Sequence, residues 1–355
     1  MKRIVITTLF SALLVVGWIA HTPSSEAAAV GISGQGNMKF RVLYTSAILP
    51  AQAQAVLKDA HGGFAVDRRP GKGETYFALP GAGILQISSD LKTVKMLNTD
   101  AEMAKQNMHN AQIWEASNGQ HYMTFPGNSA GKVYTTTLDG KLVNTLTTPP
   151  GGTHLGLPLA TNYFKGGGNF IPTDVEYLDG LFYITTGYSK LDAVLTARVD
   201  VTNSGVSTAW HDLSFGGRGT GPGQLGTGHG VSIKEGTKLI EVTDRLNAEI
   251  DRYTRYGQYI GTLNTPLGSM PCDIDYDGNY VVSGVLRGPD RSKGAPVYIY
   301  ENDELISTVM PKEDLGLENF THIHNATMRH VNGKAYLIVQ AWNPGDFAIL
   351  EQVTN

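Results

Sequence analysis

Six short and mutually similar phrases recur along the chain, and no other feature restricts its fold so strongly. Each phrase is followed by a second strand-like run, and most units contain a third. The phrases are HGGFAVD from His61, HNAQIWE from His109, TDVEYLD from Thr173, HGVSIKE from His229, CDIDYDG from Cys272 and HNATMRH from His324. The second runs span 75–79, 121–125, 181–186, 238–243, 280–285 and 335–341. Short apolar runs separated by turn residues predict a series of antiparallel meanders.

The repeated units predict an all-β fold, a six-bladed β-propeller. One unit cannot bury its own apolar face, so six units are expected to close into a ring, with the first strand of each lining a central channel. The apolar run Phe40–Tyr44 is expected to supply an outer strand that closes the ring on the last unit. Residues 30–355 are interpreted as one domain because no linker-like stretch divides them. The longest insertion, 151–170, is expected on the mouth of the channel, with His154 in a mobile flap.

The first 29 residues have the pattern of a secretory signal peptide. Lys2 and Arg3 form a basic start, 4–19 is apolar, and Ala27 and Ala29 fit the small-residue positions of a cleavage site. A retained N-terminal anchor is the alternative. Cleavage predicts a periplasmic or secreted protein with no membrane span in the mature chain, because no later run is long enough to cross a bilayer.

Composition excludes one class of partner and one kind of cross-link. The formal net charge is -4 and no basic block occurs, so nucleic acid is not an expected partner. Cys272 is the only cysteine, which rules out an intrachain disulfide. We expect a monomer whose stability comes from packing, ring closure and a bound metal.

Histidines are concentrated at one position of the repeat. The heads of the six phrases read His61, His109, Thr173, His229, Cys272 and His324. Ring symmetry would direct these side chains toward one axis, and three or four imidazoles that converge form a metal site, most readily for Zn²⁺. Three histidine ligands would leave an open position for water or substrate. The alternative is that each histidine only satisfies hydrogen bonds at the start of a strand. Asp174 and Asp273, which follow two of the heads, are expected to hold backbone amides of the channel.

Two adjacent units carry the clearest family signature. The chain reads PTDV over 172–175, TGY over 186–188, PGQL over 222–225, HGV over 229–231 and TDRLN over 243–247. In these phrases it resembles the peptidyl-α-hydroxyglycine α-amidating lyases, zinc-dependent six-bladed propellers, and the blade unit resembles an NHL repeat. The resemblance is clear over roughly residues 170–256. It implies zinc ligation by His109, His229 and His324, a catalytic Tyr188 and an active-site Arg245.

Other positions depart from the family pattern. The cysteines that form the family's disulfides are absent, and an arginine before the first blade has no counterpart better placed than Lys58. Asn325 stands where the family has an aspartate after its last zinc histidine, which bears on the family's structural Ca²⁺. His61 is an additional candidate ligand. His322 is expected to share a strand face with His324, as a further ligand or a general base.

Three functions are consistent with these residues. The resemblance implies an exported zinc lyase that cleaves a carbinolamide, an N–C–OH centre, into an amide and an aldehyde acid, on a small-molecule or peptide-derived substrate. Tyr188 would act as base, and Arg245 would hold a carboxylate or an oxyanion, although Arg245 could instead form a salt bridge between blades. The second function is a metal-dependent hydrolase of lactones or esters. The third is a non-catalytic NHL-repeat scaffold that binds a protein, against which the channel histidines argue.

Overall fold

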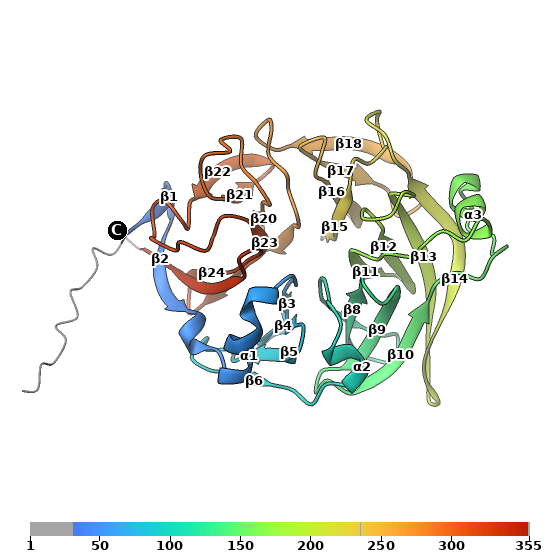
Figure 1. Ribbon diagram of the computed structural model, residues 1–355, viewed down its shortest axis with the longest axis horizontal. Helices are drawn as coiled ribbons and strands as arrows, with labels where there is room; N and C mark the ends of the chain where they lie inside the picture. The colour runs from blue at the N-terminus through green and yellow to red at the C-terminus, as the bar shows by residue number, and fades with distance from the viewer. Residues whose placement is uncertain (1–30, 235, 354–355) are drawn as a thin grey trace, which may run out of the picture. The chain divides into compact units, whose positions relative to one another are not determined.

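The computed structural model describes residues 31–353 except residue 235, and these residues form six antiparallel sheets around a central channel (Figure 1). The predicted six-bladed β-propeller is therefore confirmed. In five of the sheets the first strand in chain order lies toward the centre of the ring and later strands lie toward its rim; in the sixth, β23 is innermost and β1 and β2 lie at the rim. Blades one to six are numbered in the order in which their inner strands occur along the chain.

Blades one to five each have four strands in chain order. Blade one comprises β3 (Ala65–Val66), β4 (Thr75–Leu79), β5 (Gly83–Ile87) and β6 (Val94–Met96). Blade two comprises β7 (Gln112–Glu115), β8 (His121–Gly127), β9 (Lys132–Thr137) and β10 (Leu142–Thr147). Blade three comprises β11 (Asp174–Leu178), β12 (Leu181–Thr185), β13 (Ala193–Thr202) and β14 (Gly205–Gly216). Blade four comprises β15 (Gly228–Lys234), β16 (Leu239–Asp244), β17 (Glu249–Tyr253) and β18 (Tyr259–Asn264). Blade five comprises β19 (Asp275–Asp277), β20 (Tyr280–Gly284), β21 (Val297–Glu301) and β22 (Glu304–Val309).

Blade six joins the two ends of the propeller chain. Its strands, from the channel outward, are β23 (Ile323–Val331), β24 (Lys334–Ala341), β25 (Asp346–Gln352), β2 (Met38–Thr45) and β1 (Ser33–Gln35). Strand β2 pairs antiparallel with β25, with Phe40 opposite Gln352 and Thr45 opposite Ala348. The apolar run at 40–44 therefore closes the ring, as predicted.

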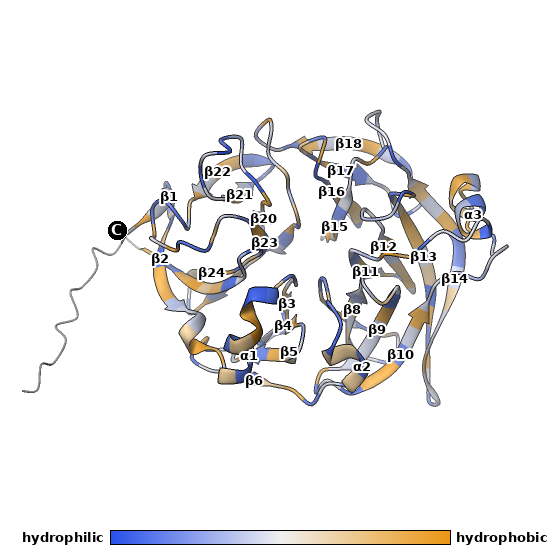
Figure 2. Ribbon diagram, in the orientation of Figure 1, coloured by the Kyte–Doolittle hydropathy of each residue, from blue (hydrophilic) through white to orange (hydrophobic). Residues whose placement is uncertain are grey.

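Apolar side chains fill the spaces between neighbouring blades. In β4, Tyr76 belongs to the core shared with blade two, whereas Phe77 belongs to the core shared with blade six. This alternation follows from the two-residue period of a strand, which sends successive side chains to opposite faces. Each fully buried side chain of this size contributes about 1.5–3 kcal/mol of transfer free energy. Figure 2 shows the resulting hydrophobic colour along strands such as β10 and β13.

Helices are short and occupy connections. They are the 3₁₀ turns η1 (Ser46–Ile48) and η2 (Leu57–Asp59) and the α-helices α1 (Ala51–Val56), α2 (Ala101–Ala104) and α3 (Pro158–Lys165). The insertion at 151–170 contains α3, which lies at the rim of the ring beside β14 rather than over the channel (Figure 1). Leu155, Ala160 and Phe164 pack into the core shared by blades two and three, and the Leu157 backbone N–H donates to Ser214 Oγ. The expected flap over the mouth is therefore wrong, because this insertion has an apolar face of its own to bury.

The predicted signal peptide at 1–29 lies outside the described residues. Among the helices at 31–353, none is long and apolar enough to pass through a bilayer.

Candidate functional site

Four histidine rings meet where the inner strands of blades one, two, four and six begin. His229 lies in β15 and His324 in β23, whereas His61 and His109 directly precede β3 and β7. The His324 ring centroid lies 4.3 Å from that of His61, 4.4 Å from that of His109 and 5.0 Å from that of His229. The column read from the sequence is thus one cluster in space.

The neighbouring blade fixes the orientation of three of these rings. Nδ1 of His109 donates to the Thr173 carbonyl at 2.7 Å, and Nδ1 of His229 donates to the Cys272 carbonyl at 2.6 Å. Nδ1 of His324 donates to the Gly62 carbonyl at 3.0 Å. A carbonyl accepts only, so each Nδ1 carries the proton and each Nε2 presents a lone pair. Metal-binding histidines typically donate their other ring N–H to such an acceptor, which fixes the tautomer and the ring orientation.

His61 has a side-chain partner instead of a backbone carbonyl. Its Nδ1 lies 2.8 Å from the Asn107 amide nitrogen, and the Asn107 amide oxygen is buried without a partner. A rotation of the Asn107 amide by half a turn places its oxygen against Nδ1, where it accepts the His61 proton. The Nε2 lone pair of His61 is then also free to bind a cation.

The chemistry of this donor set fits a metal ion. Ligating nitrogens of His61, His109 and His324 all lie within 4.8 Å of one another. The predicted ligand His229 is not in this group, because its Nε2 contacts Tyr188 Oη and Arg245. The Nε2 atoms of His109 and His324 are 3.1 Å apart, with no proton to share between them. Burial is the main cause that lowers the pKa of His109 and of His324 well below the ordinary value, and it lowers the pKa of His61 to about 3. The rings are therefore neutral at pH 7, the form that binds Zn²⁺.

Tyr188 extends its phenol oxygen into the same cluster. The oxygen lies 2.9 Å from Nε2 of His229, 3.2 Å from Nε2 of His109 and 3.5 Å from Nε2 of His61. Burial raises the pKa of Tyr188, and the cation of Arg245 opposes that rise. Tyr188 therefore needs further positive charge to become a phenolate at neutral pH.

Arg245 is a buried cation beside the phenol. Its guanidinium donates to Tyr188 Oη at 3.0 Å, to His229 Nε2 at 2.7 Å and to Cys272 Sγ at 2.9 Å. None of these described partners is a carboxylate, and Arg245 Nε has no partner. A buried guanidinium without a counter-charge is costly, so this site favours an anionic ligand. The alternative of a salt bridge between blades is wrong for Arg245 within the described residues.

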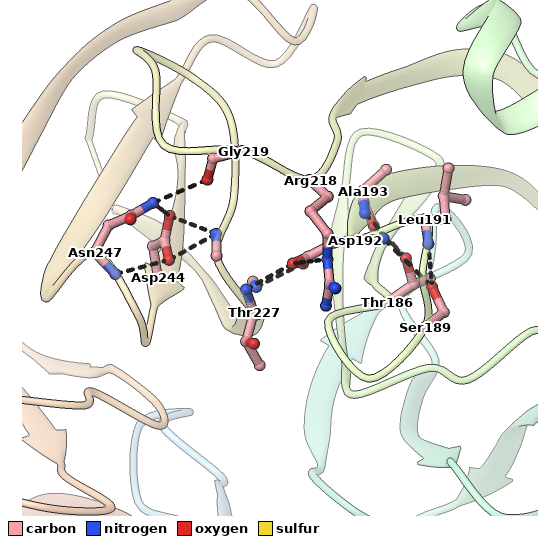
Figure 3. A network of polar contacts seen from close by, with 12 residues as sticks. Thr186, Ser189, Leu191, Asp192, Ala193, Arg218, Gly219, Thr227, Asp244 and Asn247 are labelled. Carbon is pink, nitrogen blue, oxygen red and sulfur yellow. Dashed lines mark hydrogen bonds and ion pairs between the residues drawn. The ribbon is translucent and has the colours of Figure 1, made fainter.

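A polar scaffold holds the loops that carry these groups (Figure 3). The Asp192 carboxylate accepts the backbone N–H groups of Thr227 and Gly228 at 2.6 and 2.8 Å, which sets the start of β15 just before His229. The Asp244 carboxylate accepts the Gly226 N–H at 2.9 Å and the Asn247 amide at 2.7 Å. The TDRLN corner therefore ties Arg245 to the same loop that leads into His229.

The loop after β12 presents Tyr188. Thr186 Oγ1 donates to the Ala193 carbonyl at 2.8 Å, and Ser189 Oγ accepts the backbone N–H of Leu191 at 3.2 Å (Figure 3). A Cβ added to Gly187 would lie 2.3 Å from the Gly228 carbonyl oxygen, so only glycine permits this close approach to the neighbouring blade. The glycine of the TGY phrase thus brings blade three against blade four.

Acidic and amide side chains occupy the channel beyond the histidines. Asp174 accepts the backbone N–H groups of Val175 and Val231, each at 2.8 Å, as expected for a residue that holds channel amides. Asp273 likewise accepts a backbone N–H, that of Ile274. Its Oδ2 also contacts the Asn325 amide, and its Oδ1 is buried without a side-chain partner. Asn325 Oδ1 is also buried without a partner. Burial, and then the neighbouring carboxylates, raise the pKa of Asp174 and of Asp273 well above the ordinary value.

Two predicted site residues lie apart from the cluster. Lys58 is exposed and pairs with Asp59 at 2.7 Å. His322 precedes β23, where its Nδ1 lies 3.1 Å from the Asn343 carbonyl and its Nε2 accepts from Arg287 at 3.3 Å. A register shift between Ile323 and Asn325 interrupts the strand alternation on which the expected shared face of His322 and His324 depended.

Sequence reasoning also missed residues of this site. Trp342 stacks on His61, with ring centroids 5.3 Å apart, and lies 5.7 Å from the His322 ring. Asn107 is the partner of His61 Nδ1. Asn107 lies two residues before the column residue His109, and Trp342 directly follows β24 just as Arg245 directly follows β16. The available signals were therefore nearness to a column histidine and a position at the end of a second strand.

Comparisons with known proteins agree on the fold. No protein-family model matches the chain, and no curated protein matches it. Among solved structures, a streptogramin B lyase is 12% identical over 91% of this chain and 98% of its own, with a TM-score of 0.50. A gluconolactonase from Xanthomonas campestris is 12% identical over 90% of this chain and 95% of its own, with a TM-score of 0.55. At these identities the likeness shows a six-bladed β-propeller.

Proposed function

We propose that this propeller is an exported, metal-dependent lyase that cleaves the C–N bond of a carbinolamide. One observation carries the proposal: histidine Nε2 lone pairs, the Tyr188 phenol and the unpaired Arg245 guanidinium meet at one end of the channel. Such a site combines ligands for a Lewis acid, a group that can move a proton and a binder for negative charge. A scaffold that only binds proteins has no need of this combination.

Zn²⁺ is the metal that the donor set fits best. His109, His229 and His324 would hold it, with His61 as the adjacent fourth candidate. When bound, Zn²⁺ supplies polarisation of a substrate oxygen and favours the ionised forms of nearby acids. The Arg245 contact to His229 Nε2 would then be exchanged for a contact to substrate.

Tyr188 would move the proton in this reaction. As phenolate it takes the proton from the carbinol O–H, the oxygen electrons form the C=O bond, and the C–N bond breaks with its electron pair moving to nitrogen. The phenol then returns the proton to that nitrogen, so one amide and one aldehyde leave and Tyr188 is regenerated. Arg245, which donates to Tyr188 Oη at 3.0 Å, stabilises the phenolate and binds the carboxylate of an α-hydroxyglycine-type substrate.

A substrate panel tests this proposal. The purified protein, with its metal content measured, is given an N-acyl-α-hydroxyglycine and, separately, an aldonolactone, and product release is followed for wild type and Tyr188→Phe. Release of amide and glyoxylate that requires Tyr188 supports the lyase. Lactone opening with no amide release would overturn it.

Lactone hydrolysis is the second candidate. The fold likeness to the Xanthomonas campestris gluconolactonase favours it, as do the carboxylates Asp174 and Asp273 in the channel, because carboxylates suit a hard cation that activates water. The likeness to the streptogramin B lyase favours a lyase on the same fold. Against the hydrolase, the carboxylates lie beyond the histidine cluster and are not among the contacts of Tyr188 and Arg245.

Calcium is the second cation that the family resemblance implies. Asp273 Oδ1 and Asn325 Oδ1 lack partners, and carboxylate and amide oxygens are the ligands that Ca²⁺ takes. Asn325 in place of an aspartate still offers one oxygen. We would therefore assign Ca²⁺ to this part of the channel, where it would neutralise Asp174 and Asp273. The test is to measure the thermal unfolding midpoint after chelation and again after Ca²⁺ is returned. A midpoint that does not change would contradict the assignment.

A further inference from the structure

The opposite end of the channel holds a basic cleft that the proposed function does not use. The histidines stand at the beginning of the inner strands, whereas this cleft is lined by residues where β3, β19 and β23 end. It has a volume of about 390 Å³ and reaches from Arg68 to Lys72 in blade one and to Arg329 in blade six. It is therefore separated from the metal centre by the length of an inner strand.

Positive charge exceeds negative charge in the lining of this cleft. The charged residues that line it are Asp67, Arg68, Arg69, Lys72, Asp277 and Arg329. The two carboxylates are already engaged: Asp67 pairs with Arg69 at 2.6 Å, and Asp277 pairs with Arg68 at 3.0 Å. Asp275, beside the cleft, also pairs with Arg68, at 2.6 Å. His330 adds a contact to Asp277 at 2.7 Å. The surplus charge therefore lies on Lys72 and Arg329.

Arg329 is a buried guanidinium that contacts only neutral oxygens. It is 4% exposed, and it donates to the Ser89 carbonyl at 2.7 Å and, at longer range, to the Ser88 carbonyl and Thr75 Oγ1. No described carboxylate forms an ion pair with it. Burial, and then Arg68, lower its pKa, and the carboxylates of Glu74, Asp277 and Asp90, which form no ion pair with it, oppose that shift only in part. Carbonyl dipoles orient this cation but do not neutralise it.

Gly73 lets the guanidinium reach the cleft. A Cβ built on Gly73, whose φ is +136°, would lie 2.6 Å from Arg329 Nη2. Lys72 precedes this glycine, is exposed and has no ion-pair partner among the described residues. A planar guanidinium and an adjacent flexible ammonium, both lining one cleft and both without a carboxylate, form the usual donor set for a small oxyanion.

We propose that this cleft binds a small oxyanion, a phosphate or a carboxylate, between Lys72 and Arg329. The ligand neutralises a guanidinium that links blade six to the turn after β5 in blade one. Binding at this point therefore stabilises the closure of the ring as well as filling the cleft. A free inorganic anion and the anionic group of a larger molecule share this chemistry.

Titration with inorganic phosphate, and separately with malonate, tests the proposal by calorimetry and by thermal unfolding. The full-length purified protein is compared with Lys72→Glu and with Lys95→Glu, a matched charge reversal on β6 outside the cleft. We expect one saturable site in wild type and in Lys95→Glu, and at least about tenfold weaker binding in Lys72→Glu, because an attractive charge becomes repulsive. The ratio of phosphate to malonate affinity shows which oxyanion the cleft prefers.

The outcomes separate cleanly. Arg329→Gln removes the charge but keeps an amide donor, so a folded Arg329→Gln variant should show no saturable binding. If Arg329→Gln does not fold, Lys72→Glu still tests the cleft. Equal affinity in Lys72→Glu and Lys95→Glu would show an adventitious ion only and would overturn the proposal, as would the absence of saturation in wild type. Neither result bears on the histidine cluster or on lyase activity.

Discussion

Nε2 of His109 lies 3.1 Å from Nε2 of His324, although the N–H group of each ring, at Nδ1, donates its hydrogen bond to a backbone carbonyl. Two lone pairs therefore face each other inside the protein. Neutral imidazoles in this arrangement repel, and a cation between them converts the repulsion into ligation. This relationship underlies the first prediction.

Replacing the histidines should remove the metal without unfolding the propeller. We expect His109→Ala and His324→Ala each to lower bound Zn²⁺ at least about tenfold in affinity, because each removes one of few ligands. Metal analysis and zinc titration measure this effect, and circular dichroism checks the fold. His154→Ala, at an exposed position on the insertion, is the control. Stoichiometric Zn²⁺ in a triple His109/His229/His324→Ala variant would rule out the site.

Removing the Tyr188 hydroxyl should slow turnover while sparing the metal. We expect Tyr188→Phe to reduce kcat by roughly 10²- to 10⁴-fold, the usual size of a lost acid–base group. The ring that packs at 5.2 Å from His109 and from His229 stays in place, so metal content should be unchanged. Wild-type kcat in Tyr188→Phe on the best substrate would exclude Tyr188 as the base.

Arg245→Ala should weaken substrate binding as well as catalysis. The guanidinium has no carboxylate partner of its own, so a substrate carboxylate gains most from it. We expect a higher KM together with a lower kcat/KM, measured by steady-state kinetics on substrates with and without a carboxylate. Arg255→Ala, in the exposed turn between β17 and β18, is the matched control. An unchanged KM for the carboxylate substrate would count against this role.

The buried Asp251 should make stability depend on pH. Burial raises its pKa from 3.8 to about 7. Because its carboxyl pKa is raised, the folded state keeps a proton on Asp251 that the unfolded state loses. The free energy of unfolding is therefore not reduced by Asp251 below about pH 4, and it declines as the pH rises toward 7. We expect Asp251→Asn to unfold at a higher temperature than wild type at pH 8, with a smaller difference at pH 5. Asp200→Asn, at an exposed position, should show no such trend; a parallel shift at both pH values would refute the assignment.

The repeat made the propeller and the histidine column predictable from sequence. Each phrase begins, in most units, with a polar residue and continues as a strand of alternating polarity. Closure of the ring then directs the first residues of all six phrases toward the channel. The Phe40–Tyr44 run was predictable for the same reason, because an apolar strand without its own blade needs a neighbour. These inferences depend on local periodicity and on symmetry, both of which the sequence contains.

Features that depend on a single unrepeated contact were not predictable. The insertion around α3 was placed wrongly because its apolar residues face β14, and loop composition alone does not reveal such a surface. Trp342 reaches His61, and Arg329 reaches Ser89, across the junction between blades six and one. Only the closed ring brings the residues of each pair together, because hundreds of residues separate them in the chain.

Ring closure also sets when the histidine cluster can form. His324 donates to the carbonyl of Gly62, a residue 262 positions earlier, and β25 must emerge before β2 can join blade six. A ribosome that adds about 5–20 residues per second needs on the order of ten to fifty seconds to travel from one of these residues to the other. Until the end of that interval, blade six and its His324 are not available to contact His61 and His109. The cluster is therefore among the last parts of the protein to assemble during synthesis, and a chain cut short before β23 would lack His324.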